Sequence, residues 1–315
     1  MRITWVGNHE EGVIAFRKTV KTNGVDAFIT LDEGAFSKRS AGSRDYIEIC
    51  KENNIPFFFV ETIKGEQAYK IISAQKPDLL VVLGWSEILP ERLLEIPSIG
   101  TIGTHASLLP HNRGSAPINW ALIHGEEMTG NTMMWLSKDV DAGVIVNQIE
   151  IPISRFDTCK SLYERVAETN AEMLIKLIDS LNNGIKPVLP IKNETHEPIL
   201  PRRRPKDGLI DWDQSAIHIY DFIRALTKPY PGAYTYLNGK KYLIWEATVL
   251  PVVSGESPGT ILGSGYGFAH NGSGICIATK DNTMWITLVE DEMGNEYLGK
   301  NLYELNLKGI FENEQ

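Results

Sequence analysis

The first part of this chain alternates between short apolar runs and stretches with helical spacing. The apolar runs are Ile3–Gly7, Asp26–Leu31, Pro56–Val60 and Asp78–Leu83. The helical stretches between them are Val13–Val20, Tyr46–Glu52 and Gln67–Ala74. Strands that alternate with helices form parallel sheets, because a parallel neighbour requires a crossover connection. The sequence therefore predicts an α/β fold with a parallel sheet.

Ligands of such sheets bind beyond the carboxyl ends of the strands. In this chain that edge is expected to carry Gly7-Asn8-His9, Gly84-Trp85 and His105, which follow apolar runs. The first run is not followed by a G-x-G-x-x-G motif, so dinucleotide binding lacks its main sequence support.

The segment 101–146 contains the residue types that proton transfer requires. His105 directly follows an apolar run, and Asp141 lies in an acidic turn. A helix predicted over Pro117–His124 and a strand predicted over Asn131–Leu136 lie between them. An imidazole and a carboxylate at one sheet end can act as a general acid and base. The spacing alone does not show that these two side chains meet.

Several short motifs of this segment occur in the order typical of the N10-formyltetrahydrofolate-dependent formyltransferases, which the chain resembles. They are His-Ala-Ser-Leu-Leu-Pro at 105–110, Arg113-Gly114, Ala116-Pro117-Ile118, Thr129-Gly130 and Asp141-Ala142-Gly143. Residues 208–247 are similar to the C-terminal domain of the same family. The resemblance implies a Rossmann-like parallel-sheet formyltransferase domain followed by a smaller OB-like β domain.

The resemblance also implies an activity. Members of the family transfer a formyl group from N10-formyltetrahydrofolate, a co-substrate, to an amine, and no metal is expected. They include methionyl-tRNA formyltransferase, glycinamide ribonucleotide formyltransferase and the sugar-nucleotide N-formyltransferases.

The resemblance assigns proton transfer to His105 and the orientation of its ring to Asp141. The chemistry agrees, because a nearby carboxylate favours the charged form of an imidazole. A loop after the most apolar strand resembles the family loop that holds the pterin ring, although it could also simply cap the strand. The predicted cofactor residues are Trp85, Ile88, Leu89 and Pro90, together with Asp139.

Four basic side chains are candidates for binding the acceptor. His111 and Arg113 could contact the acceptor or the folate tail, and a plain loop role is equally open. Arg203 and Arg204 lie in a run of three arginines. Guanidinium groups match phosphate oxygens in two-point geometry, so this run is either a clamp on a phosphorylated acceptor or a solvated charge run.

The chain departs from the family at Gly103, where members usually have asparagine. Glycine offers no side-chain donor to the carbonyl oxygen that becomes negative during transfer. We hypothesise that Asn131, at the start of the next predicted strand, supplies the missing amide. The alternative is an asparagine that faces solvent or caps the strand.

The second half of the chain predicts two further parts. A long amphipathic helix over Leu162–Leu181 completes a catalytic domain at 1–183. A proline-rich linker is expected over 184–208. A C-terminal domain over 209–315 is expected to contain short strands, with a hairpin turn at Asn238-Gly239.

Charge and cysteine content restrict the partners. The net charge of −9 argues against broad nucleic-acid binding, which depends on cations. The loop Asp32–Arg44, with Lys38 and Arg39, is shorter and more mixed in charge than the basic insertion of the tRNA-acting members. Cys50, Cys159 and Cys276 are too scattered for a disulfide framework, which predicts a reducing cytoplasm. Neither a secretory signal nor a membrane span is expected.

Three functions therefore compete. The first is formyl transfer to the primary amine of an amino sugar on a nucleoside diphosphate, by a homodimer. The second is formylation of methionyl-tRNA, favoured by the C-terminal domain. The third is a non-catalytic folate- or nucleotide-binding relative, favoured by Gly103.

Overall fold

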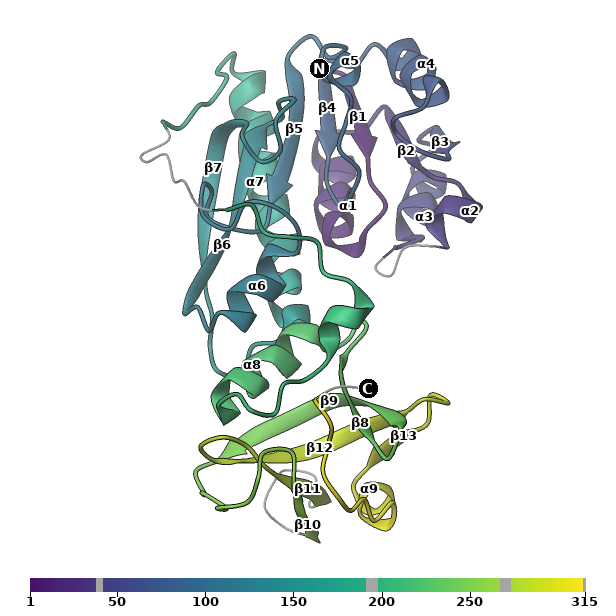
Figure 1. Ribbon diagram of the computed structural model, residues 1–315. Coiled ribbons are helices and arrows are strands. Elements are labelled where there is room, and N and C mark those ends of the chain that lie inside the picture. The colour runs from purple at the N-terminus through teal and green to yellow at the C-terminus, as the bar shows by residue number, and fades with distance from the viewer. Residues whose placement is uncertain (38–41, 191–197, 267–272, 314–315) are drawn as a thin grey trace. The chain divides into compact units, whose positions relative to one another are not determined.

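The computed structural model describes residues 1–37, 42–190, 198–266 and 273–313. The chain divides into two compact units (Figure 1). The first contains residues 1–117, 128–153 and 161–201, and the second contains 118–127, 154–160 and 202–315. Each unit is therefore assembled from several chain segments. The linear division at 183 and 208 stays a prediction.

The first unit is built on a seven-stranded sheet in the order β3-β2-β1-β4-β5-β6-β7. The strands are β1 Ile3–Val6, β2 Ala27–Leu31, β3 Phe57–Val60, β4 Leu79–Val82, β5 Gly100–His105, β6 Met128–Trp135 and β7 Val144–Pro152. The first five are parallel, whereas β6 and β7 pair antiparallel. Every residue of β1, β2 and β4 is buried, as expected for parallel strands covered on both faces. The predicted α/β class and its Rossmann-like parallel sheet are confirmed.

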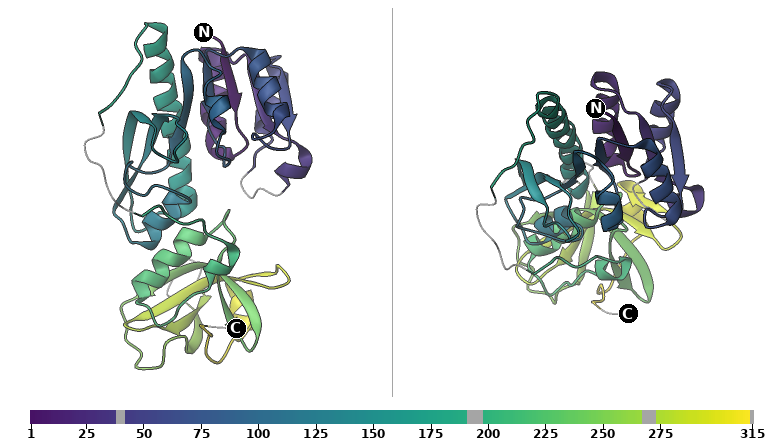
Figure 2. Two further views of the ribbon diagram at one scale, coloured as in Figure 1. Left: turned by 45° about the horizontal axis from the view of Figure 1, so that its top comes forward. Right: turned by 90° about the horizontal axis from the view of Figure 1, so that it is seen from above.

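Helices cover both faces of this sheet. The helices are α1 Val13–Thr22, α2 Glu33–Phe36, α3 Asp45–Glu52, α4 Glu66–Gln75, α5 Glu91–Leu94 and α7 Cys159–Asn182. Residues of α1, α3 and α7 share one apolar core with Trp5 of β1. Residues of α4 and α5 share the opposite core with Val6. The long teal helix α7 runs beside the strands in both views of Figure 2. Trp5 therefore lies on the face covered by α1, α3 and α7, and Val6 lies on the face covered by α4 and α5.

The second unit holds a six-stranded sheet, ordered β10-β11-β12-β9-β8 with β13 on β12. Its elements are α6 Pro117–Ile123, η2 Pro205–Gly208, α8 Ala216–Leu226, β8 Ala233–Leu237, β9 Lys240–Leu250, β10 Ile261–Tyr266, β11 Ser273–Ala278, β12 Thr283–Asp291, β13 Glu296–Leu298 and α9 Lys300–Glu304. All of these strand pairs are antiparallel. The predicted hairpin at Asn238-Gly239 is present, with φ angles of 52° and 73°, which two-residue hairpin turns of this kind require. A C-terminal β domain is confirmed.

The predicted linker contacts the rest of the first unit through Leu200. Residues 191–197 lie outside the described part. Leu200 pairs with Gly114 in a parallel bridge, and its backbone N–H donates to the Arg113 carbonyl at 2.7 Å. The segment therefore borders the loop that follows His105.

Candidate active site

His105 and Asp141 meet at the carboxyl end of β5. His105 is the last residue of that strand, and Asp141 lies in the turn between β6 and β7. Their Nδ1 and Oδ1 atoms are 3.4 Å apart, and the two side chains are 9% and 15% exposed. This separation is longer than a short hydrogen bond, as is common for catalytic pairs without substrate. The structure thus brings together two residues separated by 36 positions.

The turn around Asp141 is fixed from two sides. Asp141 has a φ of +50°, a conformation that few non-glycine residues adopt. The Gly114 N–H donates to its Oδ2 at 2.9 Å. A Cβ on Gly143 would lie 2.0 Å from the Trp135 carbonyl oxygen, so only glycine lets the turn pack against β6. These contacts hold the carboxylate toward His105.

Both ring nitrogens of His105 face oxygens. Nδ1 faces Asp141, and Nε2 lies 2.8 Å from the Asn112 carbonyl oxygen. A neutral imidazole carries one N–H and can donate to only one of them, whereas a protonated ring can donate to both. The site therefore suits a ring that takes up a proton. To accept a proton from substrate, Nε2 must face the substrate nitrogen. In this structure it faces the Asn112 carbonyl oxygen instead.

Thr132 holds the loop that follows His105. It pairs with His105 across β5 and β6, and its hydroxyl donates to the Ser107 carbonyl at 2.6 Å. The hydroxyl also accepts from the Leu109 N–H and from Gln148 Nε2, at 3.1 and 2.9 Å. Sequence reasoning did not single out Thr132 or Gln148. Strand alternation was the available signal, because Thr132 is one residue past Asn131.

Leu136 fills the space beside Gly103. A Cβ on Gly103 would lie 2.8 Å from the Leu136 Cδ2 atom. The family asparagine therefore does not fit here without movement of the leucine side chain. The core around position 103 is packed for glycine.

The hypothesis that Asn131 replaces the missing donor is wrong for this geometry. Adjacent strand residues point to opposite faces, and Asn131 lies under α7 rather than beside His105. Its Nδ2 donates to Asn170 Oδ1 at 2.7 Å and lies within 2.9 Å of the Thr169 hydroxyl and 3.3 Å of the Val166 carbonyl. The residue is fully buried. Its amide ties β6 to α7.

The residues of the predicted pterin loop differ in their exposure to solvent. Ile88 is 56% exposed, whereas Leu89 is buried in the core with Val6. Trp85 is half-buried against that core, and Pro90 is the N-terminal cap of α5. Glu87 fixes the loop, since its carboxylate accepts from the Thr62 hydroxyl and the Ile63 N–H, both at 2.9 Å. The structure places Asp139 in an exposed position in the turn before Asp141.

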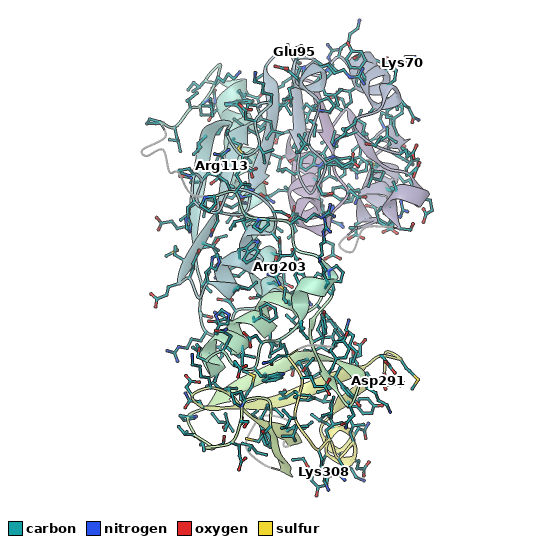
Figure 3. The ribbon with its side chains drawn as sticks, in the orientation of Figure 1. Lys70, Glu95, Arg113, Arg203, Asp291 and Lys308 are labelled. Carbon is teal, nitrogen blue, oxygen red and sulfur yellow. The ribbon has the colours of Figure 1, made fainter. Side chains whose placement is uncertain are left out.

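Arg113, labelled in Figure 3, contacts the turn that carries Asp141. Its guanidinium donates to the Val140 carbonyl at 2.7 Å. His111 is exposed, and its carbonyl accepts from the Ser107 hydroxyl at 2.7 Å. Arg113 thus joins the loop after His105 to the turn that carries Asp141. Contact of His111 or Arg113 with substrate stays a prediction.

Arg203 is engaged within the second unit (Figure 3). Its guanidinium lies 4.9 Å from the Trp120 ring centroid and 5.4 Å from that of Phe222, and it donates to the Asp207 carbonyl. Burial lowers its pKa. These contacts favour a packing role for Arg203. Arg204 is exposed, and a phosphate clamp stays a prediction.

The described residues do not favour a catalytic thiolate or a metal centre. Burial raises the pKa of the Cys50 and Cys159 thiols to about 12, which disfavours thiolate chemistry. Within the described ranges, no three His, Cys, Asp or Glu side chains group together as metal ligands. No described helix is long and apolar enough to cross a membrane.

Comparison with known proteins agrees with the site. Residues 21–178 match the formyl transferase family and residues 203–304 its C-terminal domain. The chain belongs to the formyl transferase family. It is therefore a member of a family of enzymes that transfer formyl groups. The predicted resemblance is confirmed.

Individual relatives extend this result. The methionyl-tRNA formyltransferase of Alkaliphilus oremlandii is 34% identical over 267 residues, covering 83% of this chain and 84% of that protein. The bifunctional polymyxin resistance protein ArnA of Wigglesworthia glossinidia brevipalpis is 41% identical over 212 residues, which are 67% of this chain but only 32% of that protein. The chain thus spans about a third of ArnA.

A solved structure shares the fold. The N-formyltransferase of Helicobacter canadensis, in complex with folinic acid and dTDP-3-aminofucose, superposes with a TM-score of 0.63 at 18% identity. The match covers 91% of this chain and 98% of that chain.

Proposed function

We propose that this chain transfers the formyl group of N10-formyltetrahydrofolate to the primary amine of an amino sugar carried on a nucleoside diphosphate. The observation that carries the proposal is the pairing of His105 with Asp141 at the carboxyl end of β5. Both residues lie within the segment that matches the family.

The reaction needs one group that accepts and returns a proton. The acceptor nitrogen attacks the formyl carbon, and the bond from that carbon to N10 of the folate breaks. The amine loses a proton, and N10 gains one. His105 accepts the first proton at Nε2 and donates it to N10, and Asp141 stabilises the charged ring between the two steps.

The charge distribution supports a small acceptor. Residues 202–315 contain eleven Lys and Arg against fourteen Asp and Glu, a net charge of −3. RNA binding relies on cations that neutralise phosphates. Of the basic residues in the loop 32–44, Arg44 pairs with Glu33 and lies 3.5 Å from the Phe36 ring centroid. Lys38 and Arg39 lie outside the described residues. The nucleotide-sugar in the Helicobacter canadensis complex is an acceptor of the proposed kind.

The second candidate is methionyl-tRNA formylation, which the 34% identity to a methionyl-tRNA formyltransferase over most of both chains favours. The third is a binding protein without activity, which Gly103 favours. Location in the cytoplasm and assembly into a homodimer stay predictions.

One assay separates the three. The protein is mixed with N10-formyltetrahydrofolate and with dTDP- or UDP-linked amino sugars, the same sugars without nucleotide, or methionyl-tRNA, and tetrahydrofolate release is followed. We expect release with a nucleotide-linked amino sugar. Efficient formylation of methionyl-tRNA that weakens steeply with salt would replace the first candidate by the second. Folate binding without release for any acceptor would favour the third.

A further inference from the structure

Asn8 is a buried carboxamide whose side chain is unsatisfied. The residue is 1% exposed. Neither Nδ2 nor Oδ1 has a hydrogen-bond partner in the part of the chain that the structure describes. Its backbone groups are paired, because its N–H donates to the Gly84 carbonyl at 2.8 Å and its carbonyl accepts from the Ser43 N–H at 2.8 Å. A buried amide without partners destabilises a fold, so its retention requires an explanation.

Asn8 lies at the same edge of the sheet as His105. Val6 pairs with Val82, and Val82 pairs with Gly103. Asn8 lies two residues past the end of β1, and its N–H donates to the carbonyl of Gly84, two residues past the end of β4. His105 is the last residue of β5. Because β1, β4 and β5 are neighbouring parallel strands, Asn8 and His105 both lie at the carboxyl edge of the sheet.

Asn8 follows the strand whose Val6 shares a face of the sheet with His105. A Cβ on Gly7 would contact Trp5 at 2.9 Å, so Trp5 and Gly7 share one face and Val6 lies on the other. Asn8 follows Gly7 directly. Gly103 faces Leu136, which packs against the core of Val6. His105, two residues later, is on that face as well.

We propose that Asn8 is a catalytic residue that supplies the hydrogen-bond donor absent at Gly103. Its Nδ2 donates to the formyl oxygen as this oxygen becomes negative, and its Oδ1 accepts from the N–H of the attacking amine. Asn8 carries no proton between atoms. The proposal rests on formyl transfer at His105, and it explains why one carboxamide at this edge of the sheet keeps both a donor and an acceptor unsatisfied.

The test compares Asn8→Leu and Asn8→Ala with the wild-type protein. Leucine has a similar size and removes the buried amide, so we expect an unchanged or higher unfolding temperature. Loss of one oxyanion donor lowers turnover by about 10²–10³, and we expect this loss in kcat at saturating acceptor. A structural role would lower the unfolding temperature instead.

Thr4→Val is the matched control. The Thr4 hydroxyl is also buried and unpartnered among the described residues, but it lies on β1 away from the carboxyl edge. We expect unchanged turnover. Adding Gly103→Asn and Leu136→Ala to Asn8→Leu should restore part of the lost turnover, because removal of the Leu136 side chain makes room for the family asparagine.

Two assays keep this inference separate from the choice of acceptor. Transfer to the amine measures the complete reaction, and hydrolysis of N10-formyltetrahydrofolate to formate and tetrahydrofolate measures carbonyl activation without any amine. Failure of every amine with the wild-type protein would reject the proposed acceptor, while hydrolysis still reports on Asn8. Asn8→Leu with wild-type rates, a higher KM alone, or a lower unfolding temperature would overturn the role of Asn8.

Discussion

The two faces of strand β6 carry polar side chains with different hydrogen-bond partners. On one face Thr132 accepts and donates hydrogen bonds that fix the loop after His105. On the other face Asn131 donates to α7. The two residues are neighbours in the chain, and both are fully buried. The comparison teaches that position relative to the pleat, rather than proximity to a motif in sequence, decides which polar residue can reach the reaction.

The largest effect is expected on the Thr132 face, at His105. His105→Gln removes the group that accepts and returns the proton, so turnover should fall by about 10²–10⁴. The unfolding temperature should stay close to that of the wild-type protein. Tetrahydrofolate release measures the rate, and a variant that keeps wild-type turnover would remove His105 from the mechanism.

A smaller effect is expected for Thr132→Val. The hydroxyl loses its bonds to the Ser107 carbonyl and the Leu109 N–H, and the loop after His105 loosens. A small displacement of a catalytic group can lower turnover by about 10–10². Steady-state kinetics at saturating donor measures this, and unchanged kcat would show that the loop is fixed by other contacts.

Asn131→Leu sharpens the comparison, because it alters the opposite face. Asn170 Oδ1 loses its donor, so the free energy of unfolding should fall by about 1–3 kcal/mol. Turnover should stay within about threefold of wild type, because no transition-state contact is lost. Urea unfolding and tetrahydrofolate release measure the two quantities. Loss of turnover in a stable variant would restore Asn131 as a candidate donor.

A change at Glu11, beside the end of the Asn131 network, is expected to affect stability alone. The Asn170 Nδ2 atom donates to the Glu11 carbonyl at 3.2 Å. Burial raises the pKa of the Glu11 carboxyl from 4.5 to about 7. The protonated carboxyl therefore contributes stability that is fully present below pH 4.5 and is lost as the pH rises through about 7.

Glu11→Gln cannot ionise, so its stability relative to wild type should rise between pH 5 and 8 by about 1–3 kcal/mol. Urea unfolding at several pH values measures the difference. A difference that does not change with pH would show that Glu11 is not buried in its neutral form.

The sequence predicted the sheet and the pair of site residues for separate reasons. Continuous apolar runs such as Leu79–Val82 report burial on both faces directly. The ordered motifs around His105 and Asp141 indicated a shared site, although their contact depends on the return of β6 and on the turn that Gly143 permits.

The role of Asn131 could not be predicted, because the strand register and the packing of α7 decide it. A one-residue shift in a strand reverses the face of every side chain. The same limit applies to Leu136, whose side chain fills the space beside Gly103 only because β5 and β6 are paired in this register. In sequence, Arg203 is one of three consecutive arginines. Its position over Trp120 arises from tertiary packing, which the sequence does not show.

A control for the carboxylate of Asp141 lies at the other end of the sheet. Asp26 Oδ2 accepts from the Ile3 N–H at 2.7 Å. Asp26→Asn makes the same chemical change in a hydrogen-bonded carboxylate, so it should affect stability without affecting turnover.

The measurement that tests the central claim most directly is a double-mutant cycle of turnover with His105→Gln and Asp141→Asn. Asp141 acts through the histidine ring, so Asp141→Asn alone should lower turnover by about 10² or more. In the His105→Gln background the same change should cost almost nothing, since residues that act as a unit are not additive. Losses that multiply across the two changes would contradict a mechanism in which His105 and Asp141 act as one pair.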